Sequence, residues 1–212
     1  SLLQAAIYNH HKLDLHLFHS EKLNNENAAE QLKDMDGILI APGFGQRGIE
    51  GKFAAIKYAR EHDVPCLGIC LGMQCMVIEF ARDVLGLADA NSTEMEPNTA
   101  HKVIDLMEEQ KNVTNMGGSM RLGAYDCTLK EGSKVLEAYG KEHIQERHRH
   151  RFEFNNEYKK QYEAAGMMCT GENPETNLVE VVRGRSISSG VQQYRGESES
   201  SFPQLRESCY RK

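Results

Sequence analysis

The 212-residue sequence contains no tryptophan, and aromatic residues make up only 7% of it. It also lacks any apolar run near the roughly 18 residues that a membrane-spanning helix needs. Basic side chains are not in excess, because 31 acidic residues outnumber 25 basic ones and give a net charge of −6. These absences argue against a membrane protein and against a positive surface that would hold a nucleic-acid backbone. The apolar content of 40% suits one folded domain with a sizeable core.

The six cysteines lack the paired spacing of a disulfide scaffold or a zinc ribbon. We therefore interpret them as reduced thiols and expect no metal site. The first apolar stretch, 1–8, is short and is followed by the polar run NHHK, which is not the pattern of a signal peptide. These features together predict a cytoplasmic location.

Two short apolar runs, 37–41 and 66–69, flank a helical pattern over 49–61. Strand, helix and strand in this order predict a βαβ unit, and runs that are apolar throughout are typical of parallel strands covered on both faces. We therefore expect an α/β fold with a doubly wound, mostly parallel sheet. Further helices are predicted over 2–8, 28–33, 71–85 and 157–165, further strands over 13–19 and 178–182, and mixed strand and loop over 101–155.

The composition changes at Arg183. Seven of the twelve serines fall in the last 30 residues, where neither a helical nor a strand period is present. We expect 1–182 to form the domain and 183–212 to be an aberrant, poorly ordered tail. Because 2–8 resembles the end of a helix rather than the opening strand of a doubly wound sheet, we also expect that the domain is truncated at its N-terminus.

The sharpest motif is GICLG over 68–72, placed where an apolar strand meets an apolar helix. Flanking glycines permit the tight strand-to-helix turn that exposes a nucleophile, and a helix N-terminus favours the thiolate. Cys70 is therefore the candidate nucleophile. The alternative, a buried structural cysteine, fits Cys66 and Cys75 better, since a core cysteine needs neither glycine.

A thiolate that attacks a carbonyl carbon needs donors for the oxyanion. The backbone N–H of Leu71 is one candidate, and the N–H of Gly43, in the turn APGFG over 41–45, is a second. That turn alone could equally be an ordinary strand-to-helix connection. The basic segment ERHRHR over 146–151 is also ambiguous, because it could be a solvated charged stretch or could bind a carboxylate.

Four segments resemble the glutamine amidotransferase domain of CTP synthase. They are GICLGMQ over 68–74, DANSTE over 89–94, GGSMRLG over 117–123 and ERHRHRFEFN over 146–155. The motif GICLG is shared by the wider triad-type amidotransferases, whereas GGSMRLG and ERHRHR are specific to CTP synthase. The resemblance covers about residues 1–182.

This resemblance implies a flavodoxin-like amidotransferase fold and hydrolysis of L-glutamine to glutamate and ammonia. In the full enzyme, a ligase of pyrimidine biosynthesis, an N-terminal synthetase domain uses the ammonia to convert UTP to CTP with ATP and Mg²⁺. No cofactor is implied for the amidotransferase domain itself, and GTP is implied as an effector. The segment 46–52 resembles the lid that responds to GTP, although a helix start with Glu50 in its first turn would also explain this segment. The implied partners are L-glutamine, the synthetase domain, which we expect to be absent from this chain, and other copies of the full enzyme in a homo-oligomer.

Carried over position by position, the resemblance matches Cys70 to the nucleophile. Five further residues match contacts to glutamine: Gly43, Leu71, Gln74, Glu94 and Arg151. Glu94 would hold the ammonium group of the substrate, and the region of Arg151 would face its carboxylate. Without the motif around it, Glu94 would be interpreted as an exposed loop acid.

The resemblance fails at the catalytic base. The family has a His-Pro-Glu segment that supplies this base and the acid that orients it, whereas all nine histidines here lie at or before His150. The expected region reads SSGVQQYRGE over 188–197, and Arg195 cannot act as a base near neutral pH. The genetic code allows a set of codons for residues 187–194 that, when the reading frame is shifted by one base, encodes Ser-His-Pro-Glu-Tyr-Ser-Ser. We interpret the tail as the product of a frameshift with a deletion of the preceding strand.

Three functions follow from these observations. The leading one is the glutaminase domain of CTP synthase, with activity impaired by the missing His-Pro-Glu. The alternative is a non-catalytic glutamine-binding or regulatory module of the same fold, which ammonia release from glutamine would distinguish from the first. A cysteine hydrolase with another substrate is the third, against which GGSMRLG and ERHRHR argue.

Overall fold

The computed structural model describes residues 2–106, 121–184 and 187–190, the last four by their backbone alone. Within these ranges, one sheet contains seven strands and a second contains three. The large sheet has the spatial order β1 (Ile38–Ile40), β2 (Cys66–Ile69), β10 (Ile187–Gly190), β9 (Val179–Arg183), β8 (Met168–Glu172), β5 (Arg121–Leu129) and β6 (His143–His150). The small sheet has the order β3 (Asn91–Ser92), β4 (Lys102–Leu106) and β7 (Phe152–Phe154).

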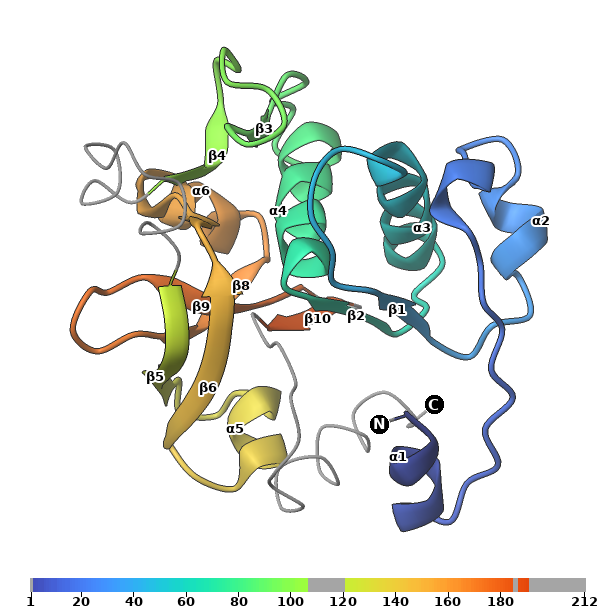
Figure 1. The fold of residues 1–212 in the computed structure, drawn as a ribbon, viewed down its shortest axis with the longest axis horizontal. Coiled ribbons are helices and arrows are strands. Elements are labelled where there is room, and N and C mark those ends of the chain that lie inside the picture. Colours follow the sequence, from blue (N-terminus) through green and yellow to red (C-terminus); the bar gives the residue numbers. More distant parts are fainter. Residues whose placement is uncertain (1, 107–120, 185–186, 191–212) are drawn as a thin grey trace.

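Six α-helices accompany these strands among the described residues (Figure 1). They are α1 (Leu2–Tyr8), α2 (Ala28–Leu32), α3 (Ile49–Glu61), α4 (Leu71–Asp83), α5 (Lys134–Tyr139) and α6 (Lys159–Ala164). Figure 1 shows α3 and α4 over one face of the large sheet, with α1 and α5 on the opposite side. Within the same part of the chain, no helix is long and apolar enough to cross a membrane.

The predicted βαβ unit is confirmed, because β1 and β2 pair in parallel and α3 connects them. β10 extends the parallel part on the other side of β2. The remaining pairs in this sheet, from β10–β9 to β5–β6, are antiparallel. One cause is the connection over 173–178 between β8 and β9, which is too short for the crossover that parallel strands require. The α/β class is thus confirmed, but the large sheet is mixed rather than mostly parallel as predicted, with the parallel pairing confined to β1, β2 and β10.

The predicted strand over 13–19 is absent, and a short strand lies within the predicted tail. The segment 13–19 forms neither helix nor strand. Leu15 and Leu17 are 53% and 88% exposed, because no neighbouring strand covers the apolar face of this alternating segment. The tail was expected to be poorly ordered from 183 onward, yet the backbone of 187–190 pairs with β2 and β9 as β10. The rest of the tail, 185–186 and 191–212, lies outside the described residues.

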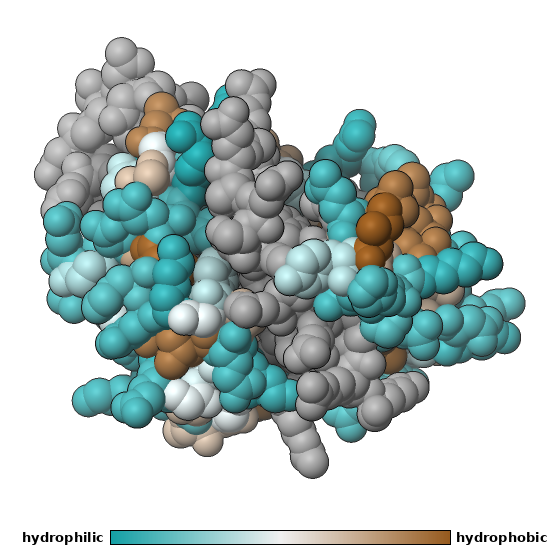
Figure 2. Space-filling model, turned by 90° about the horizontal axis from the view of Figure 1, so that it is seen from below, coloured by the Kyte–Doolittle hydropathy of each residue, from teal (hydrophilic) through white to brown (hydrophobic). Residues whose placement is uncertain are grey.

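The main core is formed by α3, α4 and the strands beneath them. Tyr162 of α6 joins this core, since its hydroxyl donates a 2.9 Å hydrogen bond to the Val77 carbonyl of α4 and its ring stacks on Phe80. Seen from below, the surface is mainly hydrophilic with apolar residues gathered in a few places (Figure 2). The helix α4, which follows Cys70, is therefore held by the core with α3 and the strands and by the contacts of Tyr162 from α6.

Candidate active site around Cys70

Cys70 lies at the junction of β2 and α4, directly before the first helical residue. Its backbone has φ 55° and ψ −111°, an unfavourable conformation for a residue with a side chain. This is the geometry of a nucleophile elbow, in which a strained turn holds a reactive side chain in place at a helix N-terminus. The structure thus builds the turn that the glycine-flanked motif predicted.

The two glycines of the motif are required by close backbone packing. A Cβ atom on Gly72 would lie 2.2 Å from the carbonyl oxygen of Ile40 in β1. A Cβ atom on Gly68 would lie 2.6 Å from the carbonyl carbon of Gly72. Any side chain at either position would push α4 away from the sheet and displace Cys70.

The Cys70 side chain is shielded from solvent, with 4% of the residue exposed. Burial is the main cause that raises its pKa, and the carboxylates of Glu153 and Glu94 raise it further. The backbone N–H of Leu71 and the ammonium of Lys52 act in the opposite direction and stabilise the thiolate. The net pKa lies above the ordinary value, so in this state the thiol keeps its proton and needs a base to become a nucleophile.

The neighbouring cysteines have the environment of structural residues. Cys66 is buried in β2, and Cys75 is fully buried in the middle of α4, where burial raises its pKa to about 12. The five cysteines within the described ranges are all free thiols, in agreement with the prediction of reduced cysteines.

The two predicted oxyanion donors come together beside the elbow. Gly43 packs against Leu71 so closely that a Cβ atom on it would lie 3.4 Å from the Leu71 Cδ2 atom. Both residues line a pocket of about 310 Å³, together with Lys52 and Phe44. Lys52 donates a 2.8 Å hydrogen bond to the Ala41 carbonyl and so holds the turn that contains Gly43.

Gln74 lies one turn into α4 and is almost fully buried. Its side-chain nitrogen donates a 3.0 Å hydrogen bond to the carbonyl oxygen of Phe152, the residue after Arg151. Its side-chain oxygen Oε1 has no hydrogen-bond partner among the described residues. Arg151 itself is half-buried in the bend between β6 and β7. The elbow helix and the predicted carboxylate-binding region are therefore directly connected.

Glu94 lies in a turn after β3 that several hydrogen bonds fix. Its backbone N–H donates to the Ser92 hydroxyl at 3.2 Å, and the Thr93 hydroxyl donates to Asp105 at 2.6 Å. Gln46, at the start of the predicted lid, donates a hydrogen bond to the carbonyl of Met95. Glu94 is half-buried rather than an exposed loop acid, and it lies near enough to influence the Cys70 thiol.

The segment 146–151 alternates between exposed and buried side chains along β6. Arg147 and Arg149 are exposed, as a solvated basic stretch would be, whereas His148 and His150 are buried. Glu146 is half-buried and accepts a 2.8 Å hydrogen bond from the Tyr139 hydroxyl. The motif therefore combines a polar surface with a buried polar face.

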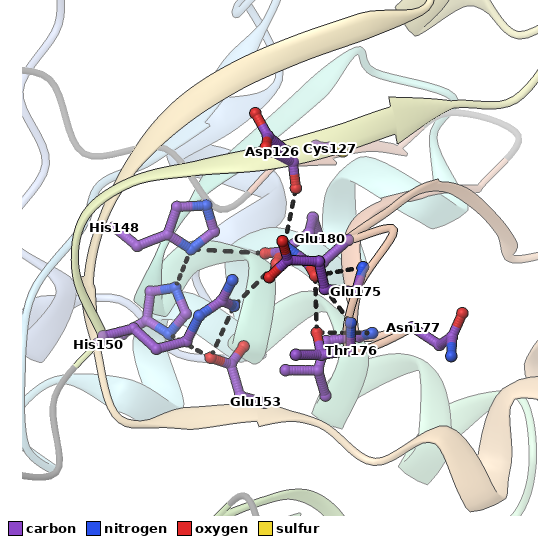
Figure 3. A network of polar contacts seen from close by, with 12 residues as sticks. Asp126, Cys127, His148, His150, Glu153, Glu175, Thr176, Asn177 and Glu180 are labelled. Atoms are coloured by element: carbon purple, nitrogen blue, oxygen red, sulfur yellow. Dashed lines mark hydrogen bonds and ion pairs between the residues drawn. The ribbon is translucent and has the colours of Figure 1, made fainter.

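Behind this face lies a buried network centred on Arg121. Figure 3 shows its members His148, His150, Glu153 and Glu180. The Nη1 atom of Arg121 donates to Glu153 at 3.1 Å and to Glu180 at 2.8 Å. Burial lowers the pKa of His148 to about 2, with His150 and Arg121 adding to the effect, so the His148 imidazole is neutral. Burial and the neighbouring Glu153 raise the pKa of Glu180 to about 7, against the opposing effect of Arg121.

Three residues around the site belong to the sequence motifs without an individual role predicted for them: Arg121 in GGSMRLG, Glu153 in ERHRHRFEFN and Lys52 in the lid. Glu180 lies in none of these motifs. No local spacing rule could join Arg121, Glu153 and Glu180, because they belong to β5, β7 and β9. The first four residues of GGSMRLG, 117–120, lie outside the described residues.

Comparison with known proteins now identifies the family. The profile of the family Glutamine amidotransferase class-I matches residues 1–194. The chain belongs to this family. A solved structure of the class I amidotransferase fold, the Trypanosoma brucei CTPS glutaminase domain with bound acivicin, has a TM-score of 0.88 and 31% sequence identity and covers 97% of this chain and 82% of that chain. The predicted amidotransferase fold is therefore confirmed.

Two curated relatives of this amidotransferase are CTP synthases. That of Porphyromonas gingivalis is 70% identical over 182 residues, which are 86% of this chain and 34% of the relative. That of Bacteroides thetaiotaomicron is 67% identical with the same coverage. The chain thus spans about one third of the length of these relatives, and the resemblance to the glutaminase domain of CTP synthase is confirmed.

Proposed function

We propose that this chain is the glutaminase domain of a CTP synthase and that Cys70 is its nucleophile. The observation that carries this proposal is the strained elbow at Cys70, with the N–H of Leu71 bonded to the thiol and Gly43 packed against Leu71. The thiolate attacks the side-chain amide carbon of glutamine, and the N–H groups of Leu71 and Gly43 stabilise the oxyanion. In a domain that has the catalytic base, the base then protonates the leaving ammonia as the C–N bond breaks, and water hydrolyses the thioester to glutamate.

The remaining predicted residues have environments that suit recognition of an amino acid. Glu94 supplies a half-buried carboxylate for the ammonium group, and Arg151 supplies a guanidinium for the carboxylate. Gln74 has a buried side-chain oxygen without a partner in the described part of the chain, which could accept a hydrogen bond from the substrate. These three roles belong to the proposal.

The partners follow from the relatives. The ammonia would pass to a synthetase domain that aminates UTP with ATP and Mg²⁺, within a homo-oligomer of the full enzyme. GTP would act on the lid over 46–52, and the hydrogen bond from Gln46 to Met95 supports this because it links the lid to the turn of Glu94. The free thiols of the described cysteines support a cytoplasmic location.

The activity of this chain depends on a base that can deprotonate Cys70. Within 2–106 and 121–184, no histidine hydrogen-bonds to the Cys70 thiol, and the sequence lacks the His-Pro-Glu of the family. The alternative of a glutamine-binding module without turnover is favoured by the absence of any histidine after His150 in this sequence. We therefore expect glutamine turnover to be reduced by about 10²–10⁴-fold relative to an intact domain.

Two measurements test this proposal. The glutamine analogue 6-diazo-5-oxo-norleucine should label Cys70 and none of the other five cysteines, as shown by peptide mapping, and excess glutamine should protect. Ammonia release should be low and should vanish in Cys70→Ala. Stoichiometric label on Cys66 or Cys75, with Cys70 unmodified, would overturn the assignment. Turnover equal to that of an intact homologous domain would show that another group acts as the base.

A further inference from the structure

Three side chains from two distant strands converge in the interior beside the Arg121 network. His148 and His150 are two residues apart on β6 and therefore project from the same face, whereas Glu180 lies on β9. The sheet order places β8 and β5 between these strands, so the sheet must curve strongly for the side chains to meet. Figure 3 shows the two rings and the carboxylate directed toward one another. One ligand atom from each of the three lies within 4.8 Å of the others.

The charges in this cluster do not cancel. Arg121 supplies one positive charge between the carboxylates of Glu153 and Glu180, and the side chains of all three are at least 94% buried. The Oε1 atom of Glu180 accepts the Arg121 hydrogen bond, but its Oε2 atom has no hydrogen-bond partner among the described residues. That free oxygen lies 3.5 Å from Nδ1 of His148. A buried carboxylate oxygen without a donor is costly and is satisfied when a cation or proton joins it.

We propose that His148, His150 and Glu180 form a binding site for a divalent transition-metal ion, with Zn²⁺ as the best match. Two imidazole nitrogens and one carboxylate oxygen are a ligand set that zinc uses in proteins. The Zn–N bond length of about 2.0–2.1 Å and tetrahedral angles place neighbouring ligand atoms roughly 3.3 Å apart. The observed separations are 2.8 Å between His148 Nδ1 and His150 Nε2 and 3.5 Å between His148 Nδ1 and Glu180 Oε2. Small side-chain shifts are enough to admit the ion.

The surroundings of the three ligands support the same assignment. The Nδ1 atom of His150 lies 3.1 Å from Oε1 of Glu153 without a hydrogen bond to it, so a carboxylate lies close to the ring nitrogen that does not face the site. Metal-binding histidines commonly have such a partner, which fixes the tautomer and the ring orientation. Arg121 holds Glu180 through the oxygen that does not face the histidines. Glu180 is thus oriented by a buried residue, and His150 has a carboxylate near the nitrogen that does not face the site.

The competing interpretation is that protons, and no metal ion, occupy the site between His148, His150 and Glu180. At 2.8 Å the two rings can share an N–H···N hydrogen bond, and protonation of Glu180 would satisfy its free oxygen. Both states use the same atoms, so metal binding must displace the hydrogen bond between the rings. The distinction is therefore measurable as stoichiometric metal uptake.

The test uses the chain without a histidine tag, stripped with a chelator and titrated with Co²⁺ and then with buffered Zn²⁺. We expect one Co²⁺ per chain, with the visible absorption of a tetrahedral site, displacement by Zn²⁺ and an increase in melting temperature. Glu180→Gln should weaken Co²⁺ binding at least tenfold, and His148→Gln with His150→Gln should abolish it. Glu153→Gln should weaken binding about tenfold or more without removing a ligand. His143→Gln, a change at an exposed histidine of the same strand, should leave it unchanged.

Two outcomes would overturn the proposal. One is a folded wild-type chain, checked by circular dichroism, that takes up no stoichiometric metal. The other is binding that persists in folded Glu180→Gln and Glu153→Gln but disappears when the exposed histidines at 10, 11, 16 and 19 are replaced by glutamine. The site is independent of glutamine hydrolysis, so Cys70→Ala should bind Co²⁺ as the wild type does. Failure of the glutaminase assignment would therefore not be mistaken for failure of the metal site.

Discussion

The side-chain amide of Gln74 donates a 3.0 Å hydrogen bond to the carbonyl oxygen of Phe152 and so joins the second turn of α4 to the start of β7. Cys70 precedes that helix, and Arg151 precedes that strand. The proposed nucleophile and the proposed anchor for the substrate carboxylate are thus held in one arrangement by a hydrogen bond between a helix and the small sheet. Positioning of this kind is what an enzyme needs to bring an amide carbon onto a thiolate.

Replacing Gln74 with methionine should weaken both the fold and the substrate site. The change keeps the volume but leaves the buried Phe152 carbonyl without its donor, which costs about 1–3 kcal/mol in the free energy of unfolding. The glutamine Kd should increase about tenfold, since the side-chain oxygen is lost as well. Urea unfolding and calorimetry would measure these effects. Gln31→Met, at an exposed position of α2, is the control and should change neither quantity.

The close contact between α4 and β1 predicts a sharp difference between two glycines. Gly72→Ala places a Cβ atom 2.2 Å from the Ile40 carbonyl oxygen, so the helix must shift, and we expect a loss of several kcal/mol in the free energy of unfolding. At Gly37 the nearest atom to a new Cβ would be the Pro65 carbonyl oxygen at 3.6 Å. Gly37→Ala should therefore be nearly neutral in the same urea experiment. Equal stability of the two variants would show that the elbow does not depend on this contact.

The charges around Cys70 predict how its alkylation depends on pH. Burial raises the pKa of this thiol, Glu153 and Glu94 add to the increase, and Lys52 and the Leu71 N–H oppose it. The rate of reaction with iodoacetamide, followed by mass spectrometry, should therefore reach its midpoint above the ordinary pKa of 9.0. Glu94→Gln should move the midpoint to lower pH, and Lys52→Met should move it higher. Glu96→Gln, at an exposed carboxylate nearby in the chain, should have no effect.

The elbow could be predicted from the sequence because everything that defines it is local. The glycines, the cysteine and the following helix lie within a few residues, and their spacing determines the backbone path. The network of Arg121, Glu153 and Glu180 could not be predicted, since its members come from β5 and β9 of the large sheet and β7 of the small sheet and meet only in the tertiary structure. The error over 13–19 has the opposite origin, because an alternating pattern forms a strand only where a neighbour pairs with it.

β8 and β10 show a second limit of sequence reasoning. The residues of β8, MCTGE, have neither an apolar run nor regular alternation, and their strand conformation depends on pairing with β5 and β9. β10, with the sequence ISSG, is inserted between β2 and β9 in the same way. In both cases tertiary pairing overrides weak local preference.

The position of β10 predicts where a catalytic base can be restored. β10 runs parallel to β2, and Gly190 pairs with Ile69, the residue before Cys70. Because the carboxyl ends of parallel strands meet at one edge of the sheet, a histidine placed shortly after Gly190 starts from the edge that carries the thiol. Arg195 and Gly196 lie outside the described residues. In the sequence YRGE over 194–197, replacing Arg195 with histidine and Gly196 with proline recreates His-Pro-Glu together with Glu197.

The double variant Arg195→His with Gly196→Pro should therefore increase ammonia release from glutamine. A general base contributes about 10²–10⁴-fold, so even a poorly aligned histidine should give a measurable gain. The gain should vanish when Cys70→Ala is added. Arg195→Gln with Gly196→Pro is the matched control, because it removes the same positive charge and adds the same proline without supplying a base. An equal gain in that control, or no gain while Cys70 still reacts with 6-diazo-5-oxo-norleucine, would show that position 195 is not where the base belongs.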